Sequence, residues 1–455
     1  MTLYAQSALT PDGWLSGVSI DIDDEGRIAS VLQTPAPRPD QMAVGHIIPA
    51  PVNVHSHAFQ RAMAGLTEYR GKGQSDSFWT WRRLMYRFLD QLTPVQIGAI
   101  AAFVQMEMLE AGYATNVEFH YLHHQPGGTP YADLAELSRR VVEAARQTGI
   151  GLTLLPVQYQ YGGCDQRPLA DGQRRFGNDL DRFQQLVEGA AKAVKTLPAD
   201  STIGIAPHSL RAVGQGDLAE LSRLLPDAPM HMHLAEQIAE VEEVQAAWGK
   251  RPVEWALDNL EMDPRWCLIH CTQMEPHETR GLAEVGAVAG LCPITESSLG
   301  DGIFDGVNWL AHGGVLAIGS DSNIRISLSE ELRTLEYSQR LRDHSRAALA
   351  SEAKSTARRM LDEVTRGGAQ AAGRDTGAIA PGKWADLTAL DAGSYHFIGR
   401  SGDGLLDSFV FAGDDRLVTD VWAAGRHVVQ SGRHVERDRI TQAYASTLQA
   451  LSMEI

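Results

Sequence analysis

Short apolar segments rich in β-branched residues alternate with longer amphipathic segments through the middle of the chain. In the longer segments, such as 132–148 and 181–197, apolar residues recur every three or four positions, as in amphipathic helices. The short segments predict eight strands, at 46–57, 115–122, 149–160, 201–209, 229–236, 266–272, 287–295 and 314–323. Eight strand–helix units predict an α/β fold, a (β/α)8 TIM-like barrel. The alternative, an open doubly wound sheet, would more often carry a Gly-rich nucleotide turn after its first strand.

Both ends of the chain follow a different pattern. The first 45 or so residues and the segment from about 377 alternate apolar and polar residues and contain Gly and Asp turns, which is typical of β-hairpins. Because chain termini often lie close together, we expect one small composite β domain built from both ends. The expected boundaries are 1–48 and 371–455 for this domain and 49–370 for the barrel.

Composition and charge limit the kinds of partner and cellular location that we expect for this protein. The charge of the 455 residues is 40 − 57 = −17, which disfavours nucleic acid and anionic membranes as partners. No apolar run approaches the roughly 18 residues of a membrane span, and the start shows no secretory signal. The four cysteines form no Cys-x-x-Cys pair, which indicates reduced thiols and a cytoplasmic location.

Potential metal ligands cluster at the ends of the predicted strands. In VNVHSHAFQRA, His55 and His57 are two residues apart and face the same side if the strand stays extended. Other residues of ligand type end later strands: His208, His233, His270 and Asp321. In a (β/α)8 barrel these ends line one mouth, where active sites are built. Three histidines and an aspartate suit one divalent metal ion, with zinc favoured over iron or manganese and one position open for water.

Glu236 lies three residues after His233, where its strand enters the mouth. Taken alone, it is most simply an acidic residue near a helix N-terminus. Beside a metal-activated water, the same carboxylate becomes a candidate for proton transfer.

The order His55-x-His57, His233, His270 and Asp321, together with the tail GAIAPGKWADLTALD, resembles the amidohydrolase superfamily over nearly the whole chain. Binuclear members carry a bridging lysine at the end of the fourth strand, whereas this chain has APHSLR there. The resemblance therefore implies a single ion held by His55, His57, His233 and Asp321. His270 then resembles a histidine of the mononuclear deaminase branch that either supports the metal ligands from behind or polarises the substrate.

A narrower resemblance rests on NVHSHAFQRAMAG, DSFWTWRRLMYRF, EFHYLHH and APHSLRAV, which are similar to the N-formimino-L-glutamate deiminases. This family hydrolyses formiminoglutamate to formylglutamate and ammonia in histidine degradation, and the resemblance implies a homodimer. Carried over by position, the substrate contacts would be Gln60, Arg82, Tyr121, His208 and Arg211.

The expected chemistry agrees with this small-molecule substrate, which has two carboxylates and an amidine-like cation. Arg82 and Arg211 would bind the carboxylates, and acidic residues would lie at the other end of the pocket. Asp321 and His270 would orient the attacking hydroxide and accept its proton, and Glu236 would pass a proton to the leaving nitrogen.

Two other functions stay open. A mononuclear aminohydrolase of a cyclic amidine such as guanine would use the same metal ligands but would favour stacking over two guanidinium groups. A noncatalytic scaffold would be expected to lack some of the ligands, all of which are present. The sequence also leaves open whether Arg82 serves its own pocket or that of a neighbouring subunit.

Overall fold

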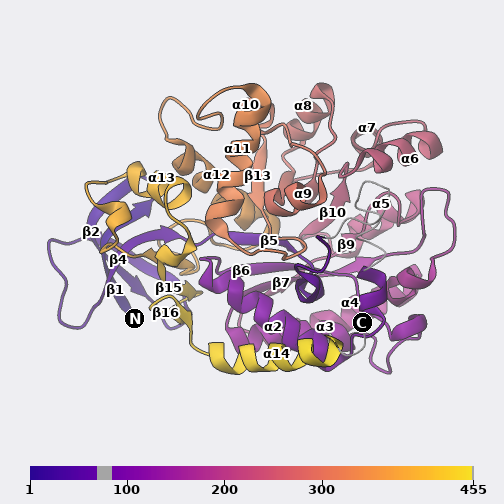
Figure 1. Cartoon of the computed structure of the whole chain (residues 1–455), viewed down its shortest axis with the longest axis horizontal. Helices are drawn as coiled ribbons and strands as arrows, with labels where there is room; N and C mark the ends of the chain where they lie inside the picture. Colours follow the sequence, from indigo (N-terminus) through magenta and orange to yellow (C-terminus); the bar gives the residue numbers. More distant parts are fainter. Residues whose placement is uncertain (69–84, 453–455) are drawn as a thin grey trace.

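The computed structural model describes residues 1–68 and 85–452. Its central unit is a barrel of parallel strands, which confirms the predicted fold class (Figure 1). The strands are β5 (Val52–Ser56), β6 (Thr115–His120), β7 (Gly151–Gln158), β8 (Thr202–Ile203), β9 (Ala206–Pro207), β10 (Met230–Leu234), β11 (Trp266–His270), β12 (Val288–Leu291) and β13 (Val315–Ile318). β8 and β9 together occupy the fourth strand position of the barrel, since both pair with β7.

Two parallel sheets, β5–β8 and β10–β13, close on each other through short bridges. On one side, Ile205 pairs with Met230, and Ser209 pairs with His233. On the other, the amides of Asp321 and His57 donate to the carbonyls of His55 and Asp321, both at 2.9 Å. The second closure lies at the carboxyl ends of the strands, so it brings the predicted ligands together.

Helices surround the barrel and connect its strands. They are α2 (Pro94–Glu110), α3 (Glu136–Thr148), α4 (Leu180–Val194), α5 (Gln215–Leu224), α6 (Ile238–Trp248), α7 (Pro252–Asn259), α8 (Pro276–Val285), α9 (Pro293–Leu299), α10 (Gly306–Ala311), α11 (Leu328–Asp343) and α12 (Thr356–Ala372). Local sequence sets their ends. Thr93 and Gln96 form a capping box at the start of α2, and Gly149 ends α3 in the left-handed conformation.

Both termini contribute to one mixed sheet beside the barrel, with the strand order β17-β16-β15-β14-β4-β1-β2-β3. The strands are β1 (Thr2–Thr10), β2 (Gly13–Ile22), β3 (Ile28–Gln33), β4 (Met42–Pro49), β14 (Leu387–Leu390), β15 (Val418–Ala423), β16 (Arg426–Gln430) and β17 (Arg433–His434). The sheet buries its own apolar cluster, which includes Leu3, Ile20 and Trp422. This arrangement confirms the predicted composite β unit.

The segment 46–57, expected to be one strand, is two. β4 belongs to the terminal sheet and β5 to the barrel, with the break at Pro49–Pro51. Proline has no amide hydrogen to donate to a sheet, so two prolines here end one ladder before the next begins.

The C-terminal segment also contains two helices that the pattern did not predict, α13 (Asp403–Phe411) and α14 (Arg437–Ser452). Figure 1 shows α14, in yellow, running beside α2 and away from the terminal sheet. Tyr444 stacks on Phe103 of α2 with ring centroids 3.9 Å apart, and Arg437 pairs with Glu110. Among the described residues, no helix has the length and apolar character needed to cross a membrane.

Candidate active site

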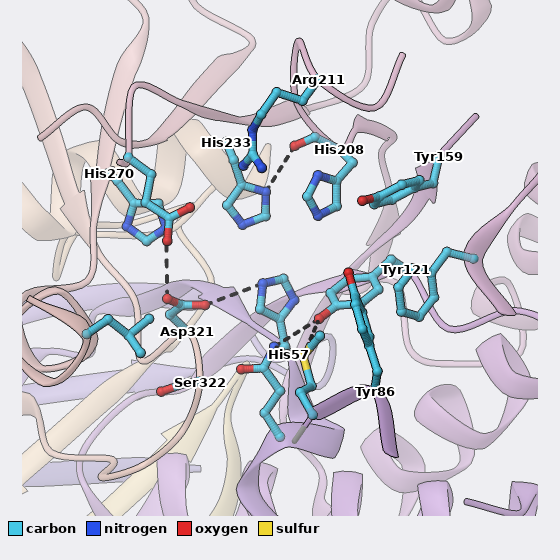
Figure 2. Close-up of a pocket in the computed structure, with 15 residues that line it drawn as sticks. His57, Tyr86, Tyr121, Tyr159, His208, Arg211, His233, His270, Asp321 and Ser322 are labelled. Atoms are coloured by element: carbon cyan, nitrogen blue, oxygen red, sulfur yellow. Dashed lines mark hydrogen bonds and ion pairs between the residues drawn. The ribbon is translucent and has the colours of Figure 1, made fainter. Parts of the chain in front are cut away.

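The imidazoles of His55, His57 and His233 meet at the carboxyl end of the barrel, and Figure 2 shows the last two of them. The Nε2 atom of His55 lies 3.1 Å from the Nε2 atoms of both His57 and His233. One oxygen of Asp321 lies 3.3 Å from His57 Nε2 and 3.5 Å from His55 Nε2. The structure thus brings together the four residues expected to hold a metal ion.

Irregular backbone allows this convergence. The register of β5 with β6 shifts between Asn53 and Ser56, so the strand is not evenly paired over the stretch that contains His55. Gly319 approaches β5 so closely that an added Cβ would lie 2.6 Å from the backbone nitrogen of His55. Asp321 itself has a φ of 47°, a conformation that non-glycine residues rarely adopt. Such strain is typical of functional sites.

Hydrogen bonds at the other ring nitrogens orient two of the imidazoles. His57 Nδ1 donates to the carbonyl of Phe119 and His233 Nδ1 to that of His208, each at 3.0 Å. With the proton on Nδ1, each Nε2 presents a lone pair to the centre, as metal ligands require. Burial lowers the pKa of His57 to about 3, and burial, reinforced by neighbouring histidines, holds the pKa values of His55 and His233 well below their ordinary range. All three imidazoles are therefore neutral at physiological pH.

The donor geometry fits a divalent ion. Metal–nitrogen bonds of about 2.0–2.1 Å place two ligand atoms on one ion about 3.0–3.4 Å apart, depending on the angle between them. The separations of 3.1–3.5 Å among these nitrogen and oxygen atoms match that spacing. His57 Nε2 and His233 Nε2, with the nearby oxygen of Asp321, therefore present lone pairs at a spacing that one ion can bridge.

A charged group borders this centre. His270 Nε2 lies 3.8 Å from Glu236 and 3.9 Å from Asp321, and its Nδ1 lies 3.2 Å from Glu296. Burial alone would lower the pKa of His270, but Glu236, Glu296 and Asp321 together raise it to about 10. Burial raises the pKa of Asp321 to about 7, against the opposing effect of His270. The site thus combines a protonated imidazole with a carboxylate that titrates near neutrality.

The predicted substrate contacts extend from this centre along one pocket. Gln60 donates to the hydroxyl of Tyr121 at 2.9 Å. Figure 2 shows His208 and Arg211 along one wall of the pocket. Arg211 is 9% exposed, and its Nη2 lies 4.0 Å from Glu240. Arg82 lies outside the described residues.

Several pocket residues were not singled out from the sequence. These are Met85, Tyr86, Tyr159, Phe176, Leu299 and Ser322. Tyr86 and Tyr159 lie at the end of the pocket opposite Asp321 (Figure 2). Tyr159 is one of the last two residues of the predicted strand 149–160, so its place at a strand end was a usable signal. Leu299 is the last residue of α9, and no sequence signal indicated its place in the pocket.

Comparison with known proteins agrees with the fold. The family model described as the amidohydrolase family matches residues 46–428. The chain belongs to this family. A formimidoylglutamate deiminase of Pseudomonas aeruginosa is 45% identical over 98% of both chains.

Solved structures resemble this chain over nearly its whole length. The crystal structure of an amidohydrolase from Brucella melitensis matches 99% of both chains with a TM-score of 0.95 and 45% identity. An adenosine deaminase from Xanthomonas campestris with bound zinc matches 99% of this chain and 98% of its own with a TM-score of 0.81. At 20% identity, that second likeness concerns the fold.

Proposed function

We propose that the protein is a metal-dependent deiminase that hydrolyses N-formimino-L-glutamate to N-formyl-L-glutamate and ammonia. The observation that carries the proposal is one pocket that joins the His55–His57–His233–Asp321 centre to the buried guanidinium of Arg211. The end of the pocket at the metal-binding centre suits hydrolysis, and the end at Arg211 suits binding of a carboxylate. The Pseudomonas aeruginosa relative, 45% identical, is a formimidoylglutamate deiminase, which supports the same substrate.

We assign His55, His57, His233 and Asp321 as the ligands of a single ion, with zinc as the first candidate. A bound divalent ion would lower the pKa of water towards about 7 and so supply a nucleophile at neutral pH. Among the described residues that line the pocket there is no lysine to bridge a second ion. Metal analysis of the purified protein tests both the identity and the stoichiometry of the ion.

Different side chains around the centre would carry out the different proton transfers of the reaction. One oxygen of Asp321 faces His55 and His57 and the other faces His270, so the second oxygen can accept a proton from the attacking water. His270 is already protonated at neutral pH, so we assign it as a hydrogen-bond donor to the substrate, in place of the proton-accepting role expected from the sequence. Glu236 lies 3.8 Å from His270 and would carry a proton to the leaving nitrogen, which departs as ammonia.

The other end of the pocket would hold the substrate. Arg211 would bind a carboxylate, and Gln60, Tyr121 and His208 would provide neutral hydrogen-bonding groups. Arg82 is expected to bind a carboxylate as well. These assignments make the two ends of the pocket complementary to a substrate with an amidine at one end and carboxylates at the other.

Ammonia release from formiminoglutamate and from guanine, measured on protein of known metal content, tests the proposal. Turnover of formiminoglutamate alone would support it. Turnover of guanine alone would keep the metal chemistry and reject the carboxylate-binding role of Arg211. Inactivity on both, with metal bound, would direct the search to other amidines and then to a noncatalytic scaffold.

Three further expectations accompany the proposal: a role in histidine degradation, a cytoplasmic location and a homodimeric state. Light scattering of the purified protein tests the last. If the protein is a dimer, loss of activity on dilution to the monomer would indicate that a neighbouring subunit completes the pocket.

A further inference from the structure

Glu240 lies in the first turn of α6, where its carboxylate contacts the chain just after β10 and approaches Arg211. One oxygen accepts a hydrogen bond from the backbone nitrogen of Glu236 at 3.1 Å, and the other accepts one from that of Ala235 at 3.2 Å. The first oxygen also lies 4.0 Å from Arg211 Nη2. The Glu240 side chain is 1% exposed, so these interactions take place away from solvent.

The backbone that carries Glu236 needs such support. Ala235 has a φ of 54°, a left-handed conformation that is unfavourable for a residue with a Cβ. On the opposite side, the hydroxyl of Thr272 donates to the carbonyl of Glu236 at 2.8 Å. Glu240 thus satisfies two consecutive amides at the end of β10, and Thr272 fixes the next carbonyl. The direction in which Glu236 leaves the strand depends on this pair of anchors.

Arg211 depends on the same carboxylate. Among the described residues, Glu240 is the one acidic side chain within 4.0 Å of this guanidinium, and the Nε of Arg211 is buried without a hydrogen-bond partner. A separation of 4.0 Å is too long for a hydrogen bond but short enough for strong electrostatic attraction. Glu240 therefore orients the guanidinium and leaves its N–H groups available to a ligand carboxylate.

We propose that Glu240 is a positioning residue that holds both Glu236 and Arg211 from one carboxylate, and so links proton transfer to recognition of the substrate carboxylate. This inference rests on the proposed function, because it assigns a substrate carboxylate to Arg211. It predicts that a change at Glu240 affects both kcat and KM, each through a different neighbour.

The first test is Glu240→Gln, which removes the charge and leaves a single oxygen acceptor for two amides. Glu243→Gln is the matched control. Glu243 is on the same helix and also accepts from a backbone amide, that of Cys164 at 3.1 Å, but it does not line the pocket. Glu240→Gln should raise KM for formiminoglutamate and lower kcat, each by about tenfold, as expected when a charge-assisted hydrogen bond is weakened. Glu243→Gln should change neither by more than about twofold, as is usual away from such features.

Double variants separate positioning from a general structural role. If Glu240 acts through Arg211, then Glu240→Gln should raise KM little further in an Arg211→Ala background. If it acts through Glu236, it should lower kcat little further in a Glu236→Gln background. A merely structural role would instead lower the unfolding midpoint and metal content and would add to both variants. Full additivity, or equal behaviour of the Glu240 and Glu243 variants, would overturn the inference.

Binding of the product N-formylglutamate, measured by calorimetry, provides a readout that needs no turnover. The native protein should bind it more tightly than Glu240→Gln or Arg211→Ala, and the double variant should bind it no more weakly than Arg211→Ala. If the native protein binds it in this way but releases no ammonia from formiminoglutamate, the proposed reaction fails and the Arg211 part of the inference stands. If the native protein does not bind this dicarboxylate, both fail.

Discussion

Replacement of Glu236 by glutamine keeps the shape of the side chain and removes its ability to ionise. Glu236 is 5% exposed, so solvent cannot readily replace it as a proton carrier. General acid–base catalysis of this kind contributes about 10²- to 10⁴-fold, which corresponds to roughly 2.7–5.5 kcal/mol of activation free energy. We therefore expect kcat to fall by at least about 100-fold.

A second effect of this substitution acts through His270. Opposite charges 3.8 Å apart, the distance from Glu236 to His270 Nε2, attract by about 4 kcal/mol at an effective dielectric constant of 20. Loss of this attraction lowers the pKa of His270 from about 10 and weakens its role as a protonated donor. The two effects act in the same direction, so the reduction in kcat should lie towards the upper end of the range.

The assay is ammonia release at saturating formiminoglutamate, with metal content and unfolding midpoint measured on the same preparation. Metal content should stay unchanged, because Glu236 is not among the three imidazoles and Asp321 that form the centre. Glu243→Gln serves as the control for the same chemical change on a carboxylate away from the pocket. A Glu236→Gln protein that retained kcat within about tenfold of the native value would refute the proton-transfer role.

Four further predictions concern binding and stability. Arg211→Ala should weaken substrate binding by about 1.5–3 kcal/mol, seen as a roughly 10- to 150-fold rise in KM. Chelation should lower the unfolding midpoint in urea, and metal at about 1,000 times its dissociation constant should restore about 4 kcal/mol. Burial lowers the pKa of His120 and of His231 from 6.5 to about 4, so the folded state favours neutral rings and loses stability as pH falls through 6.5 towards 4. When the pH is lowered from 7 to 5.5, each of these histidines should reduce the free energy of unfolding in urea by about 1 kcal/mol, and His231→Asn should remove the contribution of His231. An unfolding free energy of the native protein that does not change with pH over this range would contradict the prediction. Asp386→Asn removes one of two carboxylates beside the buried Arg374, at 3.0 Å, while Asp200 at 3.2 Å still pairs with it, so the change should cost about 1.5–3 kcal/mol in the same assay.

The strand positions could be predicted because burial on both faces makes each barrel strand a short apolar run. The segments at 115–122, 229–236 and 266–272 each contain a strand whose residues are all buried. The predicted ligands were found by the same logic, since they are polar residues at the ends of those runs. The break at Pro49–Pro51 was also readable, because proline cannot extend a sheet ladder.

Other features depend on contacts that no local pattern encodes. Glu240 reads as an ordinary acidic residue in the first turn of a helix, and only the fold places it against Arg211, 29 positions earlier in the chain. Glu296 likewise reaches His270 from the next strand–helix unit. Ala235, His270 and Asp321 adopt left-handed conformations that their residue types do not predict.

The distribution of charge in the pocket argues for one orientation of the proposed substrate. The chain as a whole has a formal charge of −17, so it attracts a dianion only where a cation is held locally. Arg211 provides such a cation on the wall beside His208 (Figure 2), whereas Glu236, Glu296 and Asp321 lie within 3.9 Å of the His270 ring nitrogens. The amidine-like cation is therefore favoured at the carboxylate-rich end and the substrate carboxylates at the guanidinium end. That orientation places the formimino carbon beside Asp321 and Glu236, the groups suited to move its protons.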